Sequence, residues 1–160
     1  MWLPDRRTFL TLAALSGCGF APAYGPGGVA AGLQGTIRAA DPNDKNGFDL
    51  VQRLEQRLGR PQSPRYDLGY SIATEEIGVG VTPDGSITRY TLTGQIDWGL
   101  RDAAGALVAS GRVDSFTAYS ATGSTVAGLA AAEDAARRLM HILADQIVMR
   151  LTATAADWRA

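Results

Sequence analysis

The sequence contains one cysteine and one histidine in 160 residues. A single thiol cannot form a disulfide within one chain, so the folded state must be stabilised by its hydrophobic core alone. Zinc sites are built mostly from several His and Cys ligands, and no Asp-x-Asp-x-Asp loop is present for calcium. The sequence therefore predicts no metal site.

An excess of charge of either sign is also lacking. Fifteen Lys and Arg residues against sixteen Asp and Glu residues give a net charge of −1, and Lys45 is the only lysine. Nucleic-acid-binding domains usually carry a clear basic excess, so we expect no nucleic-acid partner. A length of 160 residues fits one compact domain, which excludes a multidomain enzyme.

The apolar run at the amino terminus, Phe9 to Leu15, is much shorter than the roughly 20 residues that cross a bilayer. It follows the basic pair Arg6 and Arg7, an arrangement typical of a signal peptide. We therefore predict a lipoprotein signal peptide over residues 1–17. The pair and the residues that follow it also resemble a twin-arginine export signal, and export by the general pathway is the alternative.

The end of this segment, Leu15-Ser16-Gly17-Cys18, resembles the lipobox of bacterial lipoproteins. The resemblance implies cleavage before Cys18, a diacylglyceryl group on its Sγ and an acylated amino terminus. Gly19, in place of Asp, favours delivery to the outer membrane, where these acyl groups would anchor the protein at the periplasmic face. No other cofactor is expected, and a buried structural cysteine is the alternative interpretation.

The rest of the chain divides into a tether and one domain. Residues 18–32 are rich in Gly, Pro and Ala, which is typical of a flexible tether, and residues 33–160 form the domain. Residues 33–39 can form a short strand. A helix follows, because apolar residues recur at intervals of three and four up to Gly59 and Pro61, which end it. Its expected buried positions are Phe48, Val51, Leu54 and Leu58.

Three long segments then alternate between apolar and polar residues, as half-buried strands do. They cover residues 66–81, 90–101 and 107–119, with turns around Gly85 and Gly105. The first segment needs a bulge, either at the acidic pair Glu75 and Glu76 or at Gly78. Because the turns are short, the three strands are expected to form an antiparallel meander.

From Ser124 the helical spacing returns, and Ser124 or Thr125 can cap the helix. The expected buried stripe is Val126, Leu129, Ala132, Ala136, Leu139 or Met140, Leu143, Ile147 and Leu151. The element order is strand, helix, three strands, helix, and both helices have one apolar face. This predicts an α+β fold, a two-layer sandwich with two helices on one face of a four-stranded, mostly antiparallel sheet.

Catalytic motifs are missing from this framework. His141 lies in the last helix, and no Gly-x-Ser-x-Gly turn presents a serine to it. Glu75 and Glu76 are adjacent on a strand, so they point to opposite faces and cannot act as a facing carboxylate pair. We interpret them as edge or bulge residues that discourage further strand pairing. Gly78-Val79-Gly80 does not complete a phosphate-binding motif.

What remains is a polar surface on the strands. Guanidinium groups pair well with lipid phosphates and with partner carboxylates, so its arginines are candidate contacts. A simply solvated face is the alternative interpretation. The candidate residues are Arg65, Arg89, Arg101 and Arg112.

Several short motifs are similar to those of the lipopolysaccharide-assembly lipoprotein family LptE, in its alphaproteobacterial form. They are the lipobox running into Cys18–Gly25, Tyr90–Gly94, Gly111, Tyr119, Ala135–Arg138, Ala144–Ile147 and Arg150-Leu151. The resemblance implies two helices packed on a four-stranded sheet. It also implies a non-enzymatic plug and assembly partner of the outer-membrane β-barrel LptD, which passes lipopolysaccharide to the outer leaflet.

The resemblance also implies contact with lipopolysaccharide through basic residues. The low basic content favours barrel scaffolding as the main role. Two other functions remain open: an auxiliary lipoprotein of a lipid-transport ABC system, and a hydrolase that depends on His141.

Overall fold

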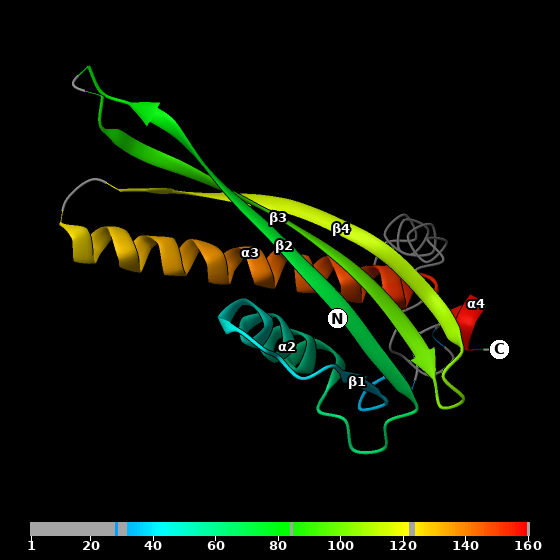
Figure 1. Ribbon diagram of the computed structural model, residues 1–160. Coiled ribbons are helices and arrows are strands. Elements are labelled where there is room, and N and C mark those ends of the chain that lie inside the picture. The colour runs from blue at the N-terminus through cyan, green and yellow to red at the C-terminus, as the bar shows by residue number, and fades with distance from the viewer. Residues whose placement is uncertain (1–27, 29–31, 84, 122–123, 160) are drawn as a thin grey trace, which may run out of the picture.

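The computed structural model describes residue 28 and residues 32–83, 85–121 and 124–159. Its elements in chain order are β1 (Ile37–Ala39), α2 (Lys45–Leu58), β2 (Tyr66–Val81), β3 (Ile87–Asp102), β4 (Leu107–Ser120), α3 (Thr125–Ala153) and α4 (Ala155–Trp158). The strands form one sheet in the order β1-β2-β3-β4, and α2 and α3 lie on one side of it (Figure 1). The predicted α+β fold and element order are confirmed, and α4 adds one short turn.

Strands β2, β3 and β4 form the predicted antiparallel meander, and β1 pairs with β2 in parallel. Gly85 and Gly105 have positive φ angles in the turns that reverse the chain. The bulge predicted in β2 lies at Gly78–Gly80, where the register with β3 shifts, and the acidic pair keeps regular register. The strand expected over residues 33–39 covers only Ile37–Ala39, although Leu33 is fully buried.

The core lies between the sheet and α3. Ile96, Leu100 and Val113 of the sheet are fully buried in the same cluster as the apolar face of this helix, and Leu68 is fully buried beside α2. Gly94 of β3 allows the close approach, because a Cβ atom there would lie 2.9 Å from Leu139 Cδ2. The buried residues that α3 contributes are Ala135, Leu139, Met140, Leu143, Ala144, Ile147, Val148 and Leu151.

Helix α2 buries a different stripe from the one that the sequence predicts. Phe48 is 57% exposed and Val51 is half-buried, whereas Leu50 is fully buried with Leu54 and Leu58. The helix packs mainly against α3, and this contact selects the Leu50 side. It begins at Asp44, whose carboxylate accepts a hydrogen bond from the Gly47 amide.

The two helices are also joined by charge. The Arg53 guanidinium donates two hydrogen bonds to the Asp145 carboxylate, from Nε at 3.0 Å and from Nη2 at 2.8 Å. Arg57 forms a second ion pair with the same carboxylate, at 3.3 Å. Asp145 therefore holds α2 against α3 through two arginines.

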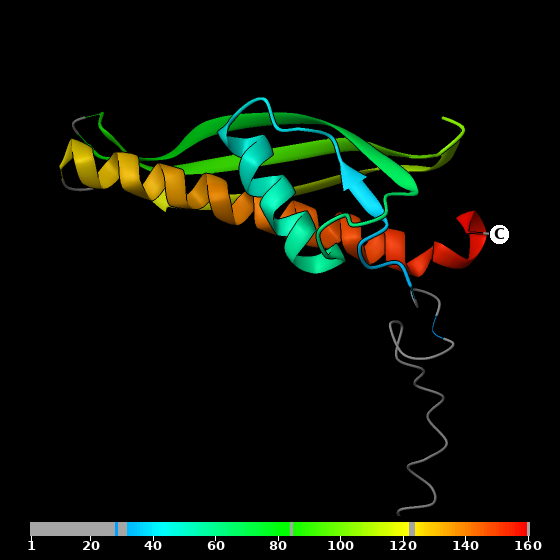
Figure 2. The same cartoon turned by 90° about the horizontal axis from the view of Figure 1, so that it is seen from below.

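Helix α3 begins at the predicted Ser124 cap, but its first turns are not buried. Val126 is 77% exposed and Leu129 is 64% exposed, so their predicted burial is wrong. Figure 1 shows why, because the β2–β3 hairpin rises away from the amino-terminal end of α3. Figure 2 shows that α2 crosses the middle of the layer and leaves this end uncovered.

Candidate functional site

The face of the sheet that points away from the helices is the main uncovered surface, and we call it the outer face. In β3 it carries the odd-numbered residues from Arg89 to Arg101, because the even-numbered ones, such as Ile96 and Leu100, are buried. Cross-strand register extends this face to Glu75 of β2 and to Arg112 and Phe116 of β4. No helix in the described parts of the chain covers it (Figure 1).

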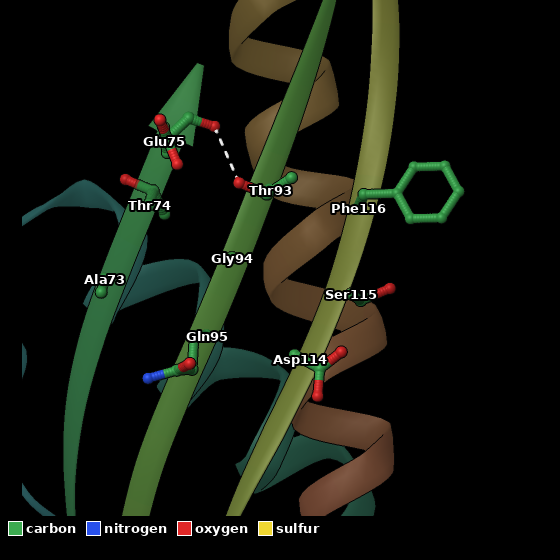
Figure 3. A pocket seen from close by; sticks show the side chains of 9 residues that line it. All are labelled: Ala73, Thr74, Glu75, Thr93, Gly94, Gln95, Asp114, Ser115 and Phe116. Carbon is green, nitrogen blue, oxygen red and sulfur yellow. Dashed lines mark hydrogen bonds between the residues drawn. The ribbon is translucent and has the colours of Figure 1, made fainter. Parts of the chain in front are cut away.

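A shallow hollow lies in the middle of the outer face. Figure 3 shows it between three strands, where Ala73 and Thr93 have small side chains and Gly94 has none. The Phe116 ring stands at its margin and points away from the sheet, 69% exposed. Such a surface suits contact with another macromolecule better than it suits catalysis, since an exposed aromatic side chain is a typical interface residue.

Three of the four candidate arginines, Arg89, Arg101 and Arg112, lie on the outer face, but at different levels. Arg89 lies near the hairpin end, opposite Ser120 of β4. Arg112 lies midway along β4, and Arg101 is close to the other end of β3. Arg65 precedes β2, is exposed, and donates its backbone N–H to the Thr36 carbonyl. The four side chains therefore do not form one cluster.

Arg112 is paired across the sheet with Asp97. Its Nε lies 2.7 Å from Asp97 Oδ1 and its Nη2 lies 3.2 Å from Oδ2, which is a bidentate arrangement. This hydrogen bonding lowers the pKa of the Asp97 carboxyl and raises the pKa of Arg112. Both groups are exposed, so the pair fixes side-chain positions more than it stabilises the fold.

A second group of charged side chains lies at the end of the outer face near β1. The sequence predicts only one of its members, Arg101. Arg38, Asp67 and Arg101 are aligned across three adjacent strands. Arg38 donates from Nε to Asp67 Oδ1 at 2.8 Å, whereas Arg101 donates from Nη1 to the Gly105 carbonyl at 2.9 Å. Asp41 lines the same pocket as both arginines, so two guanidinium groups lie near two carboxylates and the local charges balance.

The other end of the sheet is apolar and aromatic. The rings of Tyr90 and Tyr119 stack at 5.2 Å, and the Tyr119 hydroxyl donates to Glu76 Oε2 at 3.0 Å. Burial, and then this hydrogen bond, raise the pKa of Tyr119 to about 12. Beyond the tyrosines, the hairpin exposes Ile77, Val79 and Ile87.

The described residues offer no constellation for metal binding or for nucleophilic catalysis. They contain no group of three or more His, Cys, Asp or Glu residues that could hold a metal ion. The Nε2 atom of His141 is buried without a hydrogen-bond partner, so no serine hydroxyl is paired with it. Within the described ranges, no helix has both the length and the hydropathy of a membrane span.

The predicted lipid-attachment residue Cys18, the residues Leu15, Ser16 and Gly17 before it, and most of the tether lie outside the described residues. The continuous described range begins at Gly32. A Cβ atom on Gly32 would lie 3.8 Å from the Arg159 guanidinium, next to Trp158 of α4. The amino-terminal end of the domain therefore lies beside its carboxyl-terminal end.

Comparisons with known proteins agree with this architecture. A family model described as "LptE: Lipopolysaccharide-assembly" matches residues 35–151. A lipoprotein from Caulobacter crescentus of known crystal structure is 30% identical, with a TM-score of 0.68, over 82% of this chain and 98% of that one. No curated protein matches the chain.

Two more distant structures share the fold. Rare lipoprotein B from Shewanella oneidensis is 12% identical, with a TM-score of 0.59, over 78% of this chain and 98% of that one. A minor lipoprotein from Acinetobacter baumannii is 16% identical, with a TM-score of 0.53, over 74% and 90% of the two chains. The family match spans the whole sheet, α2 and nearly all of α3, and we conclude that this chain belongs to the LptE family of lipopolysaccharide-assembly proteins.

Proposed function

We propose that this protein is a lipid-anchored, non-catalytic plug and assembly partner of an LptD-type outer-membrane β-barrel in lipopolysaccharide transport. The observation that carries the proposal is the family match over residues 35–151, which includes every strand of the sheet. The anchor is the acylated Cys18, which holds the domain at the periplasmic face of the outer membrane. The resemblance of residues 15–18 to a lipobox supports this part.

The surface chemistry supports a protein partner. The outer face carries ion-paired side chains such as Arg112 and Asp97, and the exposed aromatic ring of Phe116. Non-obligate protein–protein interfaces combine polar and apolar residues in this way and are enriched in aromatic residues and arginine. We therefore assign the outer face to the contact with the barrel.

The charge distribution supports a smaller, second role in contact with lipopolysaccharide. Arg101 donates to the Gly105 carbonyl and not to Asp67, so its other N–H groups retain capacity for phosphate oxygens. The net charge of the chain is −1, which gives little long-range attraction to a polyanion. Binding to the barrel is therefore the main role, and phosphate contact is local.

The test is isolation of the full-length protein from outer membranes in mild detergent, with identification by mass of the proteins that accompany it. Recovery with a large β-barrel of the LptD type is expected. The Cys18→Ala variant should lose both the acyl mass and the outer-membrane fraction. Recovery alone, or with an inner-membrane transporter, despite intact lipidation would overturn the proposal and favour an auxiliary lipoprotein of a lipid-transport system.

Two exposed phenylalanines provide a matched pair for locating the contact. Phe116 lies on the outer face, whereas Phe48 lies on α2 in the helix layer. The Phe116→Asp variant should recover less barrel than the wild-type chain, and the Phe48→Asp variant should recover the same amount. The reverse result would move the contact to the helix layer.

A further inference from the structure

Strand β2 has two edges, and most of the edge that lies opposite β3 has no strand partner. Strand β1 pairs with β2 only at Tyr66, Asp67 and Leu68, although β2 continues to Val81. Among the described residues, no other strand pairs with this edge beyond Leu68. The same segment is almost entirely solvent-exposed from Ala73 to Val79, and α2 runs clear of its distal half (Figure 1).

The direction of the backbone groups on this edge follows from two hydrogen bonds. The Leu68 carbonyl accepts from the Ala40 amide, on the β1 side. The Glu75 carbonyl accepts from Thr93 Oγ1, on the β3 side. Because backbone direction alternates along a regular strand, the even-numbered residues present their N–H and C=O groups to the free edge. These residues are Tyr70, Ile72, Thr74 and Glu76.

A row of unpaired backbone groups is a template for one more strand, and many proteins bind extended peptides in this way. Here the first three residues of β2 already accept a parallel strand, β1, which ends at Ala39. A strand that follows β1 along the same edge would therefore continue an existing parallel ladder.

The side chains at this edge restrict what the added strand can be. Glu75 and Glu76 are adjacent, exposed, and directed to opposite faces of the sheet. Among the described residues, neither carboxylate has an ion pair, and Glu76 accepts a hydrogen bond only from Tyr119. An added strand therefore meets a negative charge on each face.

Two candidate partners for this edge fit it poorly, a second copy of β2 and the tether of this chain. A second copy of β2, paired in register around Glu75 and Glu76, would place carboxylates opposite carboxylates, which is destabilising. The tether residues 19–32 contain no Lys or Arg, and Pro22 and Pro26 lack the N–H groups that a ladder requires. The acidic pair therefore discourages pairing with this chain itself and favours a basic partner.

We propose that the β2 edge from Tyr70 to Glu76 binds an extended segment of another polypeptide that carries Lys or Arg residues opposite Glu75 and Glu76. The backbone ladder gives the affinity, and the two carboxylates give the selectivity. This contact uses the edge of the sheet and not its outer face, so it holds whether or not the barrel is the partner.

The test uses three synthetic peptides and the full-length chain in detergent. The first peptide carries an adjacent arginine-lysine pair among valines and threonines, so that one basic side chain faces each side of the sheet. The second peptide has glutamate at these two positions, and the third is the basic peptide with all its backbone N–H groups methylated. Binding is measured by calorimetry, and hydrogen exchange of the β2 amides locates it. The basic peptide should slow exchange at Ile72, Thr74 and Glu76, whereas the other two should bind at least tenfold more weakly.

Two variants test the two parts of the proposal. Thr74→Pro removes one outward N–H and leaves the hydrogen bonds to β3, since those belong to the odd-numbered residues. It should weaken binding of the basic peptide at least tenfold, whereas its matched control Thr74→Ala, which keeps the N–H, should bind like the wild-type chain. Glu75→Lys should abolish the preference for the basic over the acidic peptide, because one positive and one negative side chain then lie at the edge.

The proposal is overturned if the basic peptide leaves the β2 amides unprotected, or if acidic and basic peptides bind equally well. Equal binding to folded Thr74→Pro and Thr74→Ala would also overturn it. If Thr74→Pro fails to fold, the charge reversal with Glu75→Lys decides the question. No barrel is present in this experiment, so its outcome is independent of the function proposed above.

Discussion

At the end of the sheet near β1 the large apolar side chains are buried under the helices, whereas at the hairpin end large apolar side chains are exposed. Leu68, Ile96 and Leu100 are fully buried at the first, which we call the covered end. We call the hairpin end the open end. Its exposed apolar residues are Ile77, Val79, Ile87 and Leu129 of α3. The same strands run through both ends, so strand formation alone does not determine burial. The covered end supplies the stability of the fold, and the open end leaves surface for contacts.

The largest expected effect is on the free energy of unfolding, and it should differ between the covered end and the open end. Leu100→Ala at the covered end leaves a cavity in the core and should lower the free energy of unfolding by about 2–5 kcal/mol. Leu129→Ala removes the same atoms at the open end and should change it by less than about 0.5 kcal/mol. Urea unfolding of both variants measures the difference. Similar losses would show that the open end is packed in solution.

The next effect concerns the point at which α3 approaches the sheet closely. Gly94→Ala places a Cβ atom 2.9 Å from Leu139 Cδ2 and 3.2 Å from its Cγ, and Leu139 is fully buried. Overpacking of this kind should destabilise the protein by about 1–3 kcal/mol. Gly105→Asn in the exposed turn, where a Cβ atom has open space, is the control and should cost less. An unchanged midpoint for Gly94→Ala would mean that α3 can shift freely.

A smaller effect is expected at the open end, where Tyr119 donates to Glu76. Tyr119→Phe should cost about 0.5 kcal/mol, because both side chains are accessible to water. The pKa of Tyr119 is raised to about 12, above the ordinary value near 10, so its contribution is complete below about pH 10 and is lost as the pH rises toward 12. Burial and the nearby Asp44 and Asp41 also raise the pKa of Tyr70, so ultraviolet difference spectra of Tyr119→Phe should lose one late-titrating phenol and keep that of Tyr70. A wild-type chain without the additional late phase would contradict the prediction.

The smallest effect is expected on the outer face. Arg112→Gln removes the partner of an exposed carboxylate and should leave the unfolding midpoint unchanged within error. The pKa of the Asp97 carboxyl, lowered by Arg112, should return toward its ordinary value, so this aspartate should titrate at a higher pH in the variant. NMR titration of the Asp97 side chain measures the change. An identical titration in both chains would show that the pair does not persist in solution.

The meander and the long helix could be predicted from the sequence because their signals are local. Alternation from Tyr90 to Leu100 specifies which side chains face the helices, and it placed Arg89 and Arg101 on the same outer face. Ser124 was one of two predicted caps and does begin α3. The predicted family is confirmed as well.

The errors came from information that is not local. Leu54 and Leu58 belong equally to a stripe with Phe48 and to a stripe with Leu50, and only the position of α3 decides between them. Val126 and Leu129 continue the apolar stripe of α3, but twist carries the strands away from them. Arg38 was missed as a site residue because its alignment with Asp67 depends on a parallel pairing of three residues, which leaves no pattern in the sequence.

The described range that begins at Gly32 starts at one end of the long sheet. Gly32 lies beside Arg159, and Tyr66, the first residue of β2, contacts Trp158 of α4 with ring centroids 5.0 Å apart. From this point β2 runs for 16 residues, about 50 Å at ~3.3 Å per residue. An acyl anchor upstream of Gly32 would therefore attach the molecule by the end that carries α4, and the β2–β3 hairpin would lie about one strand length from the point of attachment.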